Sequence, residues 1–272
     1  MTSKIANVPL LISRSTTTTE TNKTGFWRYL RPEFNEKTCP CSVACPAGED
    51  IARIEKLINQ NLFKQALETI LIENPFPSVC GRVCFHTCEN ACNRNEFDES
   101  LAIHNIERFL GDEAINNGLA PVIFRFPPNG KKIAIVGAGP AGLSAAYFMT
   151  LLGYYCDIFE SDSEPGGILR WGIPEYRLPV NILEYEISRI EKTGIKINCG
   201  QLVTEDFLKD LYQSHNAVII GAGLGRTVKM NIPGEEGAIE GLSFLHNMKK
   251  GETTSLKGPV AVIGGGNTAV DV

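Results

Sequence analysis

The first half of the chain carries apolar residues at helical spacing. The first such stretch begins after Asp50, a second resumes after a break near Asn61, and a third begins near Ser100, a suitable N-cap residue. The apolar positions are Ile51, Ile54, Leu57 and Ile58, then Leu67, Ile70 and Leu71, then Ile103, Ile106 and Leu110. This pattern predicts a small all-α domain, which we place at residues 37–127.

The segments on either side of these helices have a different composition. Residues 1–36 include the polar run SRSTTTTETNKTG, which offers too little apolar surface to order itself, so we predict a flexible N-terminal tail. The later run LAPVIFRFPPNGKK is rich in proline and ends in glycine and lysine, which predicts a linker to a second domain.

After this linker, short apolar runs alternate with helical stretches. The runs are KKIAIV, YYCDIFE, IKINC and AVIIGAG, and the helices are expected through Met149 and near residues 181–193 and 205–213. An apolar run, a helix and another apolar run form the βαβ pattern of a parallel sheet that is buried on both faces. We therefore predict an α/β Rossmann-type domain, with a doubly wound parallel sheet, at residues 128–256. Residues 257–272 would begin a second Rossmann domain.

Composition and charge narrow the function classes. The chain of 272 residues is 43% hydrophobic and 21% charged, as is usual for a globular protein, and its net charge of −5 gives no electrostatic case for nucleic acid or anionic membrane. Its apolar runs fall short of the ~18 residues that a membrane span needs, and the N-terminus does not resemble a signal peptide. We therefore expect a cytoplasmic protein, in which clustered thiols bind metal more often than they form disulfides.

The motif GAGPAG follows the first predicted strand directly and precedes a helix. Its first glycine permits a tight turn, the second lets a pyrophosphate approach the backbone at the helix N-terminus, and the third allows close helix–strand packing. An acid 23 residues later, at the end of the next strand, suits a ribose hydroxyl. A glycine turn without a ligand is the less favoured alternative, because strand, turn, helix and acid are all in register. The predicted contacts are Gly137, Gly139, Pro140, Ala141, Gly142 and Glu160.

Two further glycine features extend this predicted site. In EPGGILRWGIPEYRLP, the pair Gly166 and Gly167 would let the backbone approach a flat ligand, with Arg170 nearby. An ordinary glycine-rich loop is the alternative there. We also include Gly223, which follows the apolar run AVIIGAG at its end.

A second copy of the fingerprint, GPVAVIGGGNTAVDV, ends the sequence. It predicts a strand at residues 260–263 followed by a turn and a helix, and the sequence stops at Val272 within that helix. A domain that ended there could not close its sheet, so we expect the sequence to be a fragment of a longer protein. The predicted contacts of this second site are Gly264, Gly266, Asn267 and Ala269.

Seven of the nine cysteines fall between residues 39 and 92, and four of them are spaced four residues apart. On one straight helix the outer two would lie about 18 Å apart, too far for a single metal centre. Either the segment bends, or the thiols serve more than one site. The run CSVACP has the C-x-x-x-C-P pattern of iron–sulfur proteins. The candidate ligands are Cys39, Cys41, Cys45, Cys80, Cys84, Cys88 and Cys92.

The residues alone leave alternatives open. Zinc is the main rival to iron–sulfur, although seven thiols exceed one zinc site and fall one short of two; inert thiols are a third interpretation. Cys156 and Cys199 lie in predicted strands and are expected in the core. His86 and His104 are either ligands or, as is more usual for histidine, residues at the surface or next to the ligands. Thr204 predicts a helix start.

Five motifs in this order resemble the small (beta) subunit of bacterial glutamate synthase and its oxidoreductase relatives, including the N-terminal half of dihydropyrimidine dehydrogenase. The motifs are CSVACPAGEDI, NPFPSVCGRVCFHTCENACNR, VGAGPAGLSAAYF, GGILRWGIPEYRLP and VIGGGNTAVDV. The resemblance implies a helical domain with [4Fe-4S] clusters, an FAD domain, and a nicotinamide domain inserted into the FAD domain. It assigns the first fingerprint to FAD and the second to the pyrophosphate of NAD(P)H.

The resemblance also implies two sets of cluster ligands. The family's second cluster uses two cysteines upstream of Cys41, and this sequence has only Cys39 there. Cys80 lies outside the family's usual ligands and could substitute for a missing one. The implied sets are Cys45, Cys84, Cys88 and Glu107 for the first cluster, and Cys41 and Cys92 with Cys39 for the second.

These features predict an electron-transfer flavoprotein subunit that passes electrons between NAD(P)H, FAD and the clusters. The expected partner is a larger catalytic oxidoreductase subunit, such as that of glutamate synthase, or a ferredoxin. Two alternatives are a flavin-dependent disulfide reductase, which would need a C-x-x-C motif that this sequence lacks, and a zinc-bound interaction domain on a nucleotide-binding scaffold. The sequence leaves the choice between NADH and NADPH open.

Overall fold

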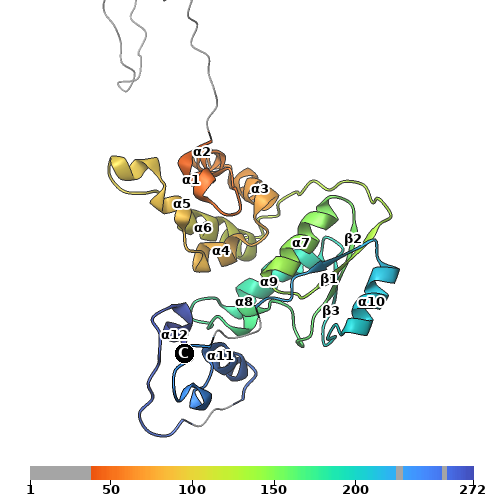
Figure 1. The fold of residues 1–272 in the computed structure, drawn as a ribbon. Coiled ribbons are helices and arrows are strands. Elements are labelled where there is room, and N and C mark those ends of the chain that lie inside the picture. The colour runs from red at the N-terminus through yellow and green to blue at the C-terminus, as the bar shows by residue number, and fades with distance from the viewer. Residues whose placement is uncertain (1–37, 225–228, 253–255) are drawn as a thin grey trace, which may run out of the picture. The chain divides into compact units, whose positions relative to one another are not determined.

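The computed structural model describes residues 38–224, 229–252 and 256–272, which belong to one compact unit from Thr38 to Val272 (Figure 1). The predicted tail at residues 1–36 lies outside the described residues. Among the described helices, none is both long and apolar enough to cross a membrane.

Short helices make up the first part of the described chain, as predicted. Asp50 caps α2 by accepting a hydrogen bond from the backbone N–H of Arg53 at 3.2 Å. Proline occupies the first turn of α1 and of α4, where its missing N–H is not needed. The bounds are α1 (Pro40–Ala44), α2 (Ile51–Asn59), α3 (Phe63–Glu73), α4 (Pro77–Val83), α5 (Thr87–Asn90), η2 (Asn93–Glu96) and α6 (Ile103–Asn116).

The predicted apolar stripes form a core between α2, α3 and α6. Leu67, Ile70, Leu71 and Leu110 are fully buried there, and Ile54 packs with them. Because these residues recur every three or four positions, each helix turns one apolar face towards the others.

The start of α6 differs from the prediction. Ser100 does not cap it: the helix begins at Ile103, and Ala102 at the N-cap position offers no side-chain hydrogen bond. Instead, the carboxylate of Glu89 in α5 accepts a hydrogen bond from the backbone N–H of His104 at 3.0 Å. Glu89, from another segment, therefore satisfies one free backbone N–H in the first turn of α6. The sequence pattern predicted that Ser100, shortly before the helix, would do this.

The segment that carries the four evenly spaced cysteines, residues 80–92, bends and does not form one helix. Cys84 ends α4 in an extended conformation, and His86 adopts the left-handed conformation with φ of 53° before α5 begins. The spacing left two alternatives open, a bend in the segment or thiols that serve more than one site. The structure shows the bend.

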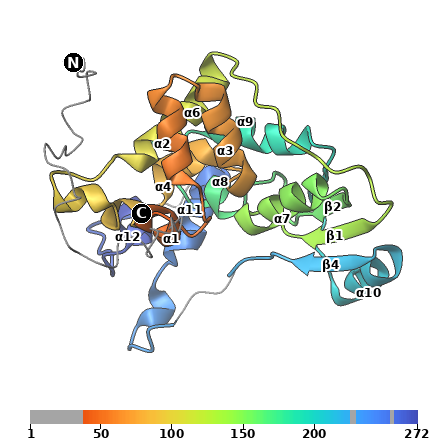
Figure 2. The ribbon, with the colours of Figure 1, turned by 90° about the horizontal axis from the view of Figure 1, so that it is seen from above.

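Four parallel strands form a sheet in the order β3-β2-β1-β4. In its register, Ile135 pairs with Ile158 on one side and with Ile219 on the other. Figures 1 and 2 show α7 and α10 on opposite faces of the sheet, as a doubly wound fold requires. The bounds are β1 (Lys132–Val136), α7 (Pro140–Leu151), β2 (Tyr155–Phe159), α8 (Ile168–Trp171), α9 (Val180–Glu191), β3 (Lys196–Asn198), α10 (Glu205–Ser214) and β4 (Ala217–Ile220).

Smaller predictions in this part have mixed outcomes. Thr204 caps α10 by accepting a hydrogen bond from the backbone N–H of Phe207, as predicted. Cys156 is buried in the sheet core, also as predicted. Cys199 follows β3 and is only half-buried, so its assignment to the core is wrong. That residue lies beyond the end of the strand, where alternation no longer directs a side chain inwards.

The predicted linker has no helix or strand, yet it is held along the sheet part. The backbone N–H of Phe126 donates to the carbonyl of Leu151 at 2.8 Å. The guanidinium of Arg125 donates to the carbonyls of Thr150 and Thr193 at 3.1 and 2.6 Å. These bonds fix it beside the ends of α7 and α9.

A buried carboxylate joins the helical part to the sheet part. Glu186 of α9 is 1% exposed and accepts hydrogen bonds from the backbone N–H groups of Ser78 at 2.7 Å and Val79 at 3.2 Å. These donors belong to the first turn of α4, so Glu186 caps that helix from a distance. Burial raises the pKa of Glu186 to about 7, although Arg189 beside it favours the charged form.

This carboxyl predicts a pH dependence of stability. In the unfolded chain Glu186 loses its proton near 4.5, whereas the folded chain holds it to about 7. The unfolded state therefore binds fewer protons in this window, and the free energy of unfolding should fall as pH rises from about 4.5 to 7. In Glu186→Gln this contribution should disappear, which urea denaturation across the window would measure. Glu191→Gln, an exposed change on the same helix, should keep the wild-type slope; a wild-type slope in the Glu186 variant would contradict the assignment.

The C-terminal segment contains η3 (Glu235–Gly237), α11 (Gly241–Lys249) and α12 (Asn267–Asp271). The predicted strand at 260–263 is wrong for this structure: the described residues 256–266, directly before α12, form no strand. Val260, Val262 and Ile263 are 58, 51 and 66% exposed. An isolated strand leaves its N–H and C=O groups unpaired, and the described sheet offers this segment no partner.

Candidate functional site

The first glycine fingerprint forms a tight turn between β1 and α7. Gly137 has a φ of 99°, and a Cβ there would lie 2.5 Å from the carbonyl oxygen of Gly221 after β4. A Cβ on Gly142 would overlap the carbonyl oxygen of Gly137. At Gly139 the nearest atom to an added Cβ would be 3.9 Å away, so this position leaves room for a ligand. The turn follows β1, where the strand order reverses between β2 on one side and β4 on the other, the switch point at which such sheets bind ligands.

Glu160 supports this turn from the end of β2. Its carboxylate is buried and accepts hydrogen bonds from the backbone N–H of Ala138 at 2.6 Å and of Asp162 at 2.9 Å, and from the hydroxyl of Ser161 at 3.0 Å. A carboxylate has about four acceptor positions, so three bonds leave capacity for a ribose hydroxyl.

The paired glycines pack directly against the turn. Gly167 has a φ of 51°, and a Cβ there would lie 2.7 Å from the Cα of Gly139. The backbone N–H of Gly166 donates to the carbonyl of Ala138 at 2.8 Å. The sequence reasoning found this loop but not its contact with the fingerprint.

Arg170 points away from this turn. Its guanidinium donates to the carbonyl of Pro165 at 2.7 Å and forms ion pairs with Glu164 at 2.6 Å and Glu184 at 3.5 Å. The structure places its side chain within the protein, behind the glycine loop, rather than on the wall of the cavity described next.

A cavity of about 830 Å³ opens over the turn, within the range of small-molecule sites. The backbone of the turn forms one side, with Gly137, Gly139, Pro140 and Ala141 on it, and Glu160, Gly167 and Gly223 extend the lining. Gly142 and Gly166 lie behind these residues and shape the wall without lining it.

Residues that the sequence reasoning missed close another side of the cavity. Asp162 holds α11 through a contact with Nε2 of His246 at 3.4 Å and an ion pair with Lys250 at 3.0 Å. The ammonium of Lys250 lies 5.4 Å from the ring centre of Trp171, and the indole Nε1 is buried without a hydrogen-bond partner among the described residues. No single-sequence signal links α11 to this loop, because the contact joins segments some 80 residues apart.

The second fingerprint does not form a comparable site among the described residues. Gly264, Gly266, Asn267 and Ala269 are not in the lining of the cavity over the first turn, and the described residues 256–263 directly before them form no strand. The short α12 is held by Asp271, which accepts hydrogen bonds from Arg177 at 2.6 Å and from the hydroxyl of Tyr176 at 2.9 Å.

The structure gathers three of the candidate thiol ligands in one small cluster with a buried carboxyl nearby. Cys88 is 6% exposed and packs with Ile51 and Ile103, while Cys41 and Cys45 border the same cluster. Glu107 of α6 is 6% exposed and close enough to Cys88 to influence its ionisation. Burial, Glu107 and Cys45 raise the pKa of Cys88 to about 12, and burial also raises the pKa of Cys45.

Two buried acids stand together at this site. Burial and the neighbouring Glu49 raise the pKa of Glu107 to about 9. Glu49 is 1% exposed; one of its oxygens accepts from Asn74 at 2.7 Å, and the other is buried with no partner among the described residues. Iron carried by a cluster would supply the positive charge that such thiols and carboxyls require. The residues present therefore fit the group.

Cys80 has a different environment from its neighbours. Its thiol lies 3.6 Å from the side-chain oxygen of Asn74 and packs against the core of the sheet part. Burial and the nearby carboxyl of Glu107 raise its pKa well above the usual range.

Cys39 and Cys41 form a second, shallower group. Their sulfur atoms are 3.3 Å apart. Burial and Cys39 raise the pKa of Cys41 to about 11; hydrogen bonds from Ser42 outweigh burial and lower the pKa of Cys39. Cys92 is buried and lies at the N-cap position of η2, after α5.

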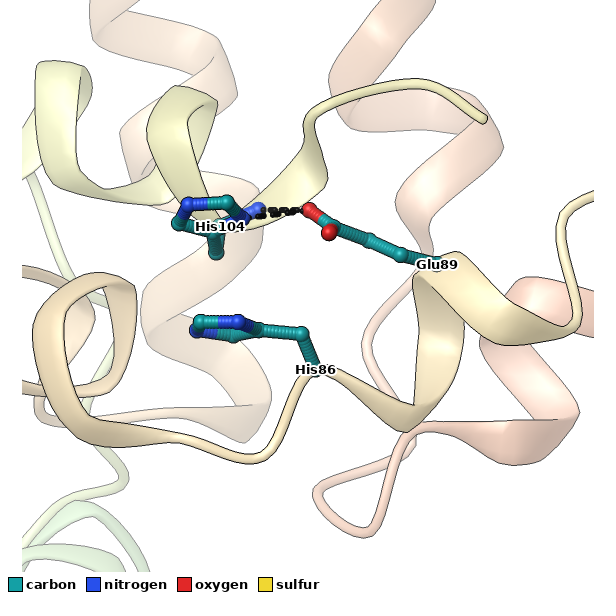
Figure 3. Close-up of side chains that lie close together, drawn as sticks. All are labelled: His86, Glu89 and His104. Atoms are coloured by element: carbon teal, nitrogen blue, oxygen red, sulfur yellow. Dashed lines mark hydrogen bonds and ion pairs between the residues drawn. The ribbon is translucent and has the colours of Figure 1, made fainter. Parts of the chain in front are cut away.

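Beside the first group, His86, Glu89 and His104 lie together, as Figure 3 shows. The two imidazole rings are stacked, with centres 4.0 Å apart and planes at 16°. Burial and His104 lower the pKa of His86. Sequence reasoning singled out both histidines but missed Glu89, which no spacing rule distinguishes from a surface acid.

A doubly wound sheet with a glycine turn at its switch point, preceded by a group of buried thiols, defines a dinucleotide-binding protein with a metal-cluster segment. Residues 131–272 match the family model described as pyridine nucleotide-disulphide oxidoreductase, and residues 34–119 match dihydropyrimidine dehydrogenase domain II, 4Fe-4S cluster. The chain therefore belongs to the family of FAD and iron–sulfur oxidoreductase small subunits. The cofactors of these domains are [4Fe-4S], FAD and NAD(P)H.

Three relatives cover most of this chain. NADPH-Fe(3+) oxidoreductase subunit beta of Geobacter sulfurreducens is 38% identical over 246 residues, which are 88% of this chain and 37% of the relative. NADP(+)-dependent formate dehydrogenase subunit beta of Moorella thermoacetica is 39% identical over 86% of this chain and 37% of its own length. NAD-dependent dihydropyrimidine dehydrogenase subunit PreT of Escherichia coli is 36% identical over 86% of this chain and 57% of its own. The chain thus spans between about a third and three fifths of these relatives.

Proposed function

We propose that this chain is part of an electron-transfer flavoprotein subunit that passes electrons between NAD(P)H, FAD and [4Fe-4S] clusters, to or from a partner oxidoreductase. The observation that carries this proposal is the continuity between the two sites. Leu169 of α8, next to the cavity, belongs to the same hydrophobic core against which Cys80 and Val83 pack. The residues directly before the proposed ligand Cys84 and the helix next to the cavity therefore border one packed interior.

In this proposal the glycine turn and the loop at 166–167 hold the dinucleotide portion of FAD. Bound FAD supplies the exchange between two-electron hydride chemistry and one-electron transfer. The chain would bind and orient it: the free N–H groups at the start of α7 would hold the pyrophosphate, and Glu160 keeps the turn in shape through Ala138. Trp171 and α11 shield the cavity from water on another side.

The proposed ligands of the first cluster are Cys45, Cys84, Cys88 and Glu107. A carboxylate is a harder donor than a thiolate, so Glu107 would change the reduction potential of this cluster relative to four-cysteine ligation. The proposed ligands of the second cluster are Cys41 and Cys92 with Cys39, and Cys80 is the alternative for the missing position.

The remaining parts of the proposal concern organisation and partners. We assign residues 37–127 to the cluster domain, 128–256 to the FAD domain and 257–272 to the start of the NAD(P)H domain, whose second fingerprint would bind the nicotinamide dinucleotide. The partner would be a larger catalytic subunit, that of glutamate synthase included, or a ferredoxin. The relatives are named as subunits, which supports a multi-subunit assembly. Nine free cysteines favour the reducing cytoplasm as its compartment.

Reduction of a substrate disulfide is not proposed, although the family model carries that name. Such a reaction needs a redox-active cysteine pair near the flavin, and the sequence has no C-x-x-C motif.

The absorption spectrum of the chain purified without oxygen tests this function. We expect flavin bands superimposed on broad iron–sulfur absorption, with iron and acid-labile sulfide in equal amounts. Addition of NADPH or NADH to a preparation that also contains the partner domains should bleach the flavin. Zinc without labile sulfide, or a preparation that holds no flavin when FAD is supplied, would contradict the proposal.

A further inference from the structure

The cluster of His86, Glu89 and His104 connects the two segments that carry the proposed ligands. His86 lies midway between Cys84 and Cys88, two residues from each. His104 precedes Glu107 by three residues on α6, so the two side chains share one face of that helix. The stacked rings therefore join the cysteine loop to the helix that carries the carboxylate (Figure 3).

Glu89 holds this contact through two hydrogen bonds. Its Oε1 lies 2.6 Å from Nδ1 of His104 and also accepts the backbone N–H of the same residue at 3.0 Å. It thereby caps α6 and orients the ring of His104, which stacks on His86. A single carboxylate fixes the start of the helix, one ring and, through that ring, the turn of the cysteine loop.

His86 in turn shapes the environment of a ligand sulfur. Its left-handed backbone, with φ of 53°, aims its N–H at the sulfur of Cys84 at 3.5 Å. Left-handed conformations are uncommon for residues other than glycine, although asparagine, aspartate and histidine adopt them more often than most, so contacts outside the turn help to maintain this one. Stacking on His104 supplies such a contact.

The three donors are close enough to be considered for a metal ion of their own, but their geometry opposes that role. The lone pairs of an imidazole lie in the plane of its ring, and two planes at 16° stacked 4.0 Å apart do not direct them to one point. Nδ1 of His104 is also engaged by Glu89.

We propose that Glu89, His104 and His86 form a clamp that positions Cys84 and Cys88 against Glu107, and so sets the reduction potential and retention of the cluster those residues hold. This rests on the ligand set of the proposed function. Groups that orient metal ligands and donate to ligand sulfurs tune both affinity and potential. The three residues are positioning residues and need not touch the cluster.

Three variants test the clamp in the whole chain. His104→Ala removes the stacked ring but keeps the backbone N–H that Glu89 caps. His86→Asn keeps a residue that tolerates the left-handed turn but removes the stack. Glu89→Gln retains an oxygen for the backbone N–H and loses the charge, which makes it the mildest change. His215→Ala is the matched control, because it also breaks a histidine–carboxylate pair, with Asp157 at 3.3 Å, in the sheet part.

The readouts are iron and sulfide per chain, the rate of iron loss to a chelator, and the reduction potential from a titration followed by electron paramagnetic resonance. Loss of the charge-assisted hydrogen bond in Glu89→Gln and His104→Ala should speed iron loss about tenfold. Loss of the ring stack in His86→Asn should speed it in the same direction, and the potential should shift in all three variants. The control should change neither. A shifted potential separates positioning from general destabilisation.

The outcomes distinguish this inference from the function on which it rests. A wild-type chain without cluster iron would overturn the proposed function and the clamp together. A wild-type chain with its cluster, and clamp variants with unchanged potential and retention, would overturn the clamp alone. Stoichiometric zinc that is present in the wild type and lost in His104→Ala would replace the clamp with a metal site.

Discussion

Replacing Cys88 by alanine should remove one cluster's iron and acid-labile sulfide from the chain. Cys88 is 6% exposed and lies beside Cys45 and Glu107, so a lost thiolate leaves a buried gap that solvent does not readily fill. Iron–sulfur clusters depend on a full set of ligands, and three remaining donors hold them poorly. Iron and sulfide analysis of protein purified without oxygen, with the paramagnetic signal of the reduced protein, measures this loss.

Cys156→Ala provides the control, because Cys156 is also buried but lies in β2 within the sheet core. The Cys156 variant should keep the full iron content and lose only packing contacts within the sheet core. Full iron in the Cys88 variant would refute its assignment as a ligand. The same analysis on Cys80→Ala and Cys39→Ala tests the ligands of the second cluster. The variant that loses iron identifies the residue that completes this ligand set.

The parts of the fold that could be predicted are those encoded in short stretches of sequence. The strands β1, β2 and β4 are largely apolar runs, and the glycine turn after β1 is a local backbone requirement, so both could be identified without tertiary information. The apolar run at 260–263 has the same local pattern but no strand partner, and it is not a strand in this structure. Pattern alone cannot supply the partner.

The missed features depend on contacts between distant segments. Ser100 had the right type for a cap, but Glu89 from α5 supplies the bond at the start of α6. The spacing of the cysteines was compatible with a helix, and only the left-handed turn at His86 shows how the loop divides its thiols. Glu49 resembles a surface acid in sequence, yet it is almost fully buried beside Glu107. Each case requires knowledge of what another segment places nearby.

Alanine at Gly142 should abolish flavin binding and destabilise the sheet part. An added Cβ would overlap the carbonyl oxygen of Gly137 and approach the side chain of Ile135 at 3.3 Å. The backbone of the turn cannot move aside without shifting Gly137, which is itself tightly packed against Gly221. Overpacking of this kind costs about 3 kcal/mol. Flavin content per chain and the free energy of unfolding in urea measure the two effects.

Gly237→Ala is the matched control, because that glycine lies in η3 with nothing within 4 Å of an added Cβ and without a positive φ. It should retain flavin and stability. The two measurements on Gly142→Ala also separate two roles of the turn. If flavin is lost while the free energy of unfolding stays at the wild-type value, the glycine serves the ligand alone. If both fall together, helix–strand packing and cofactor binding depend on the same close approach, as the position of Gly142 behind the cavity wall leads us to expect. Flavin bound at the wild-type level would refute the assignment of this turn to FAD.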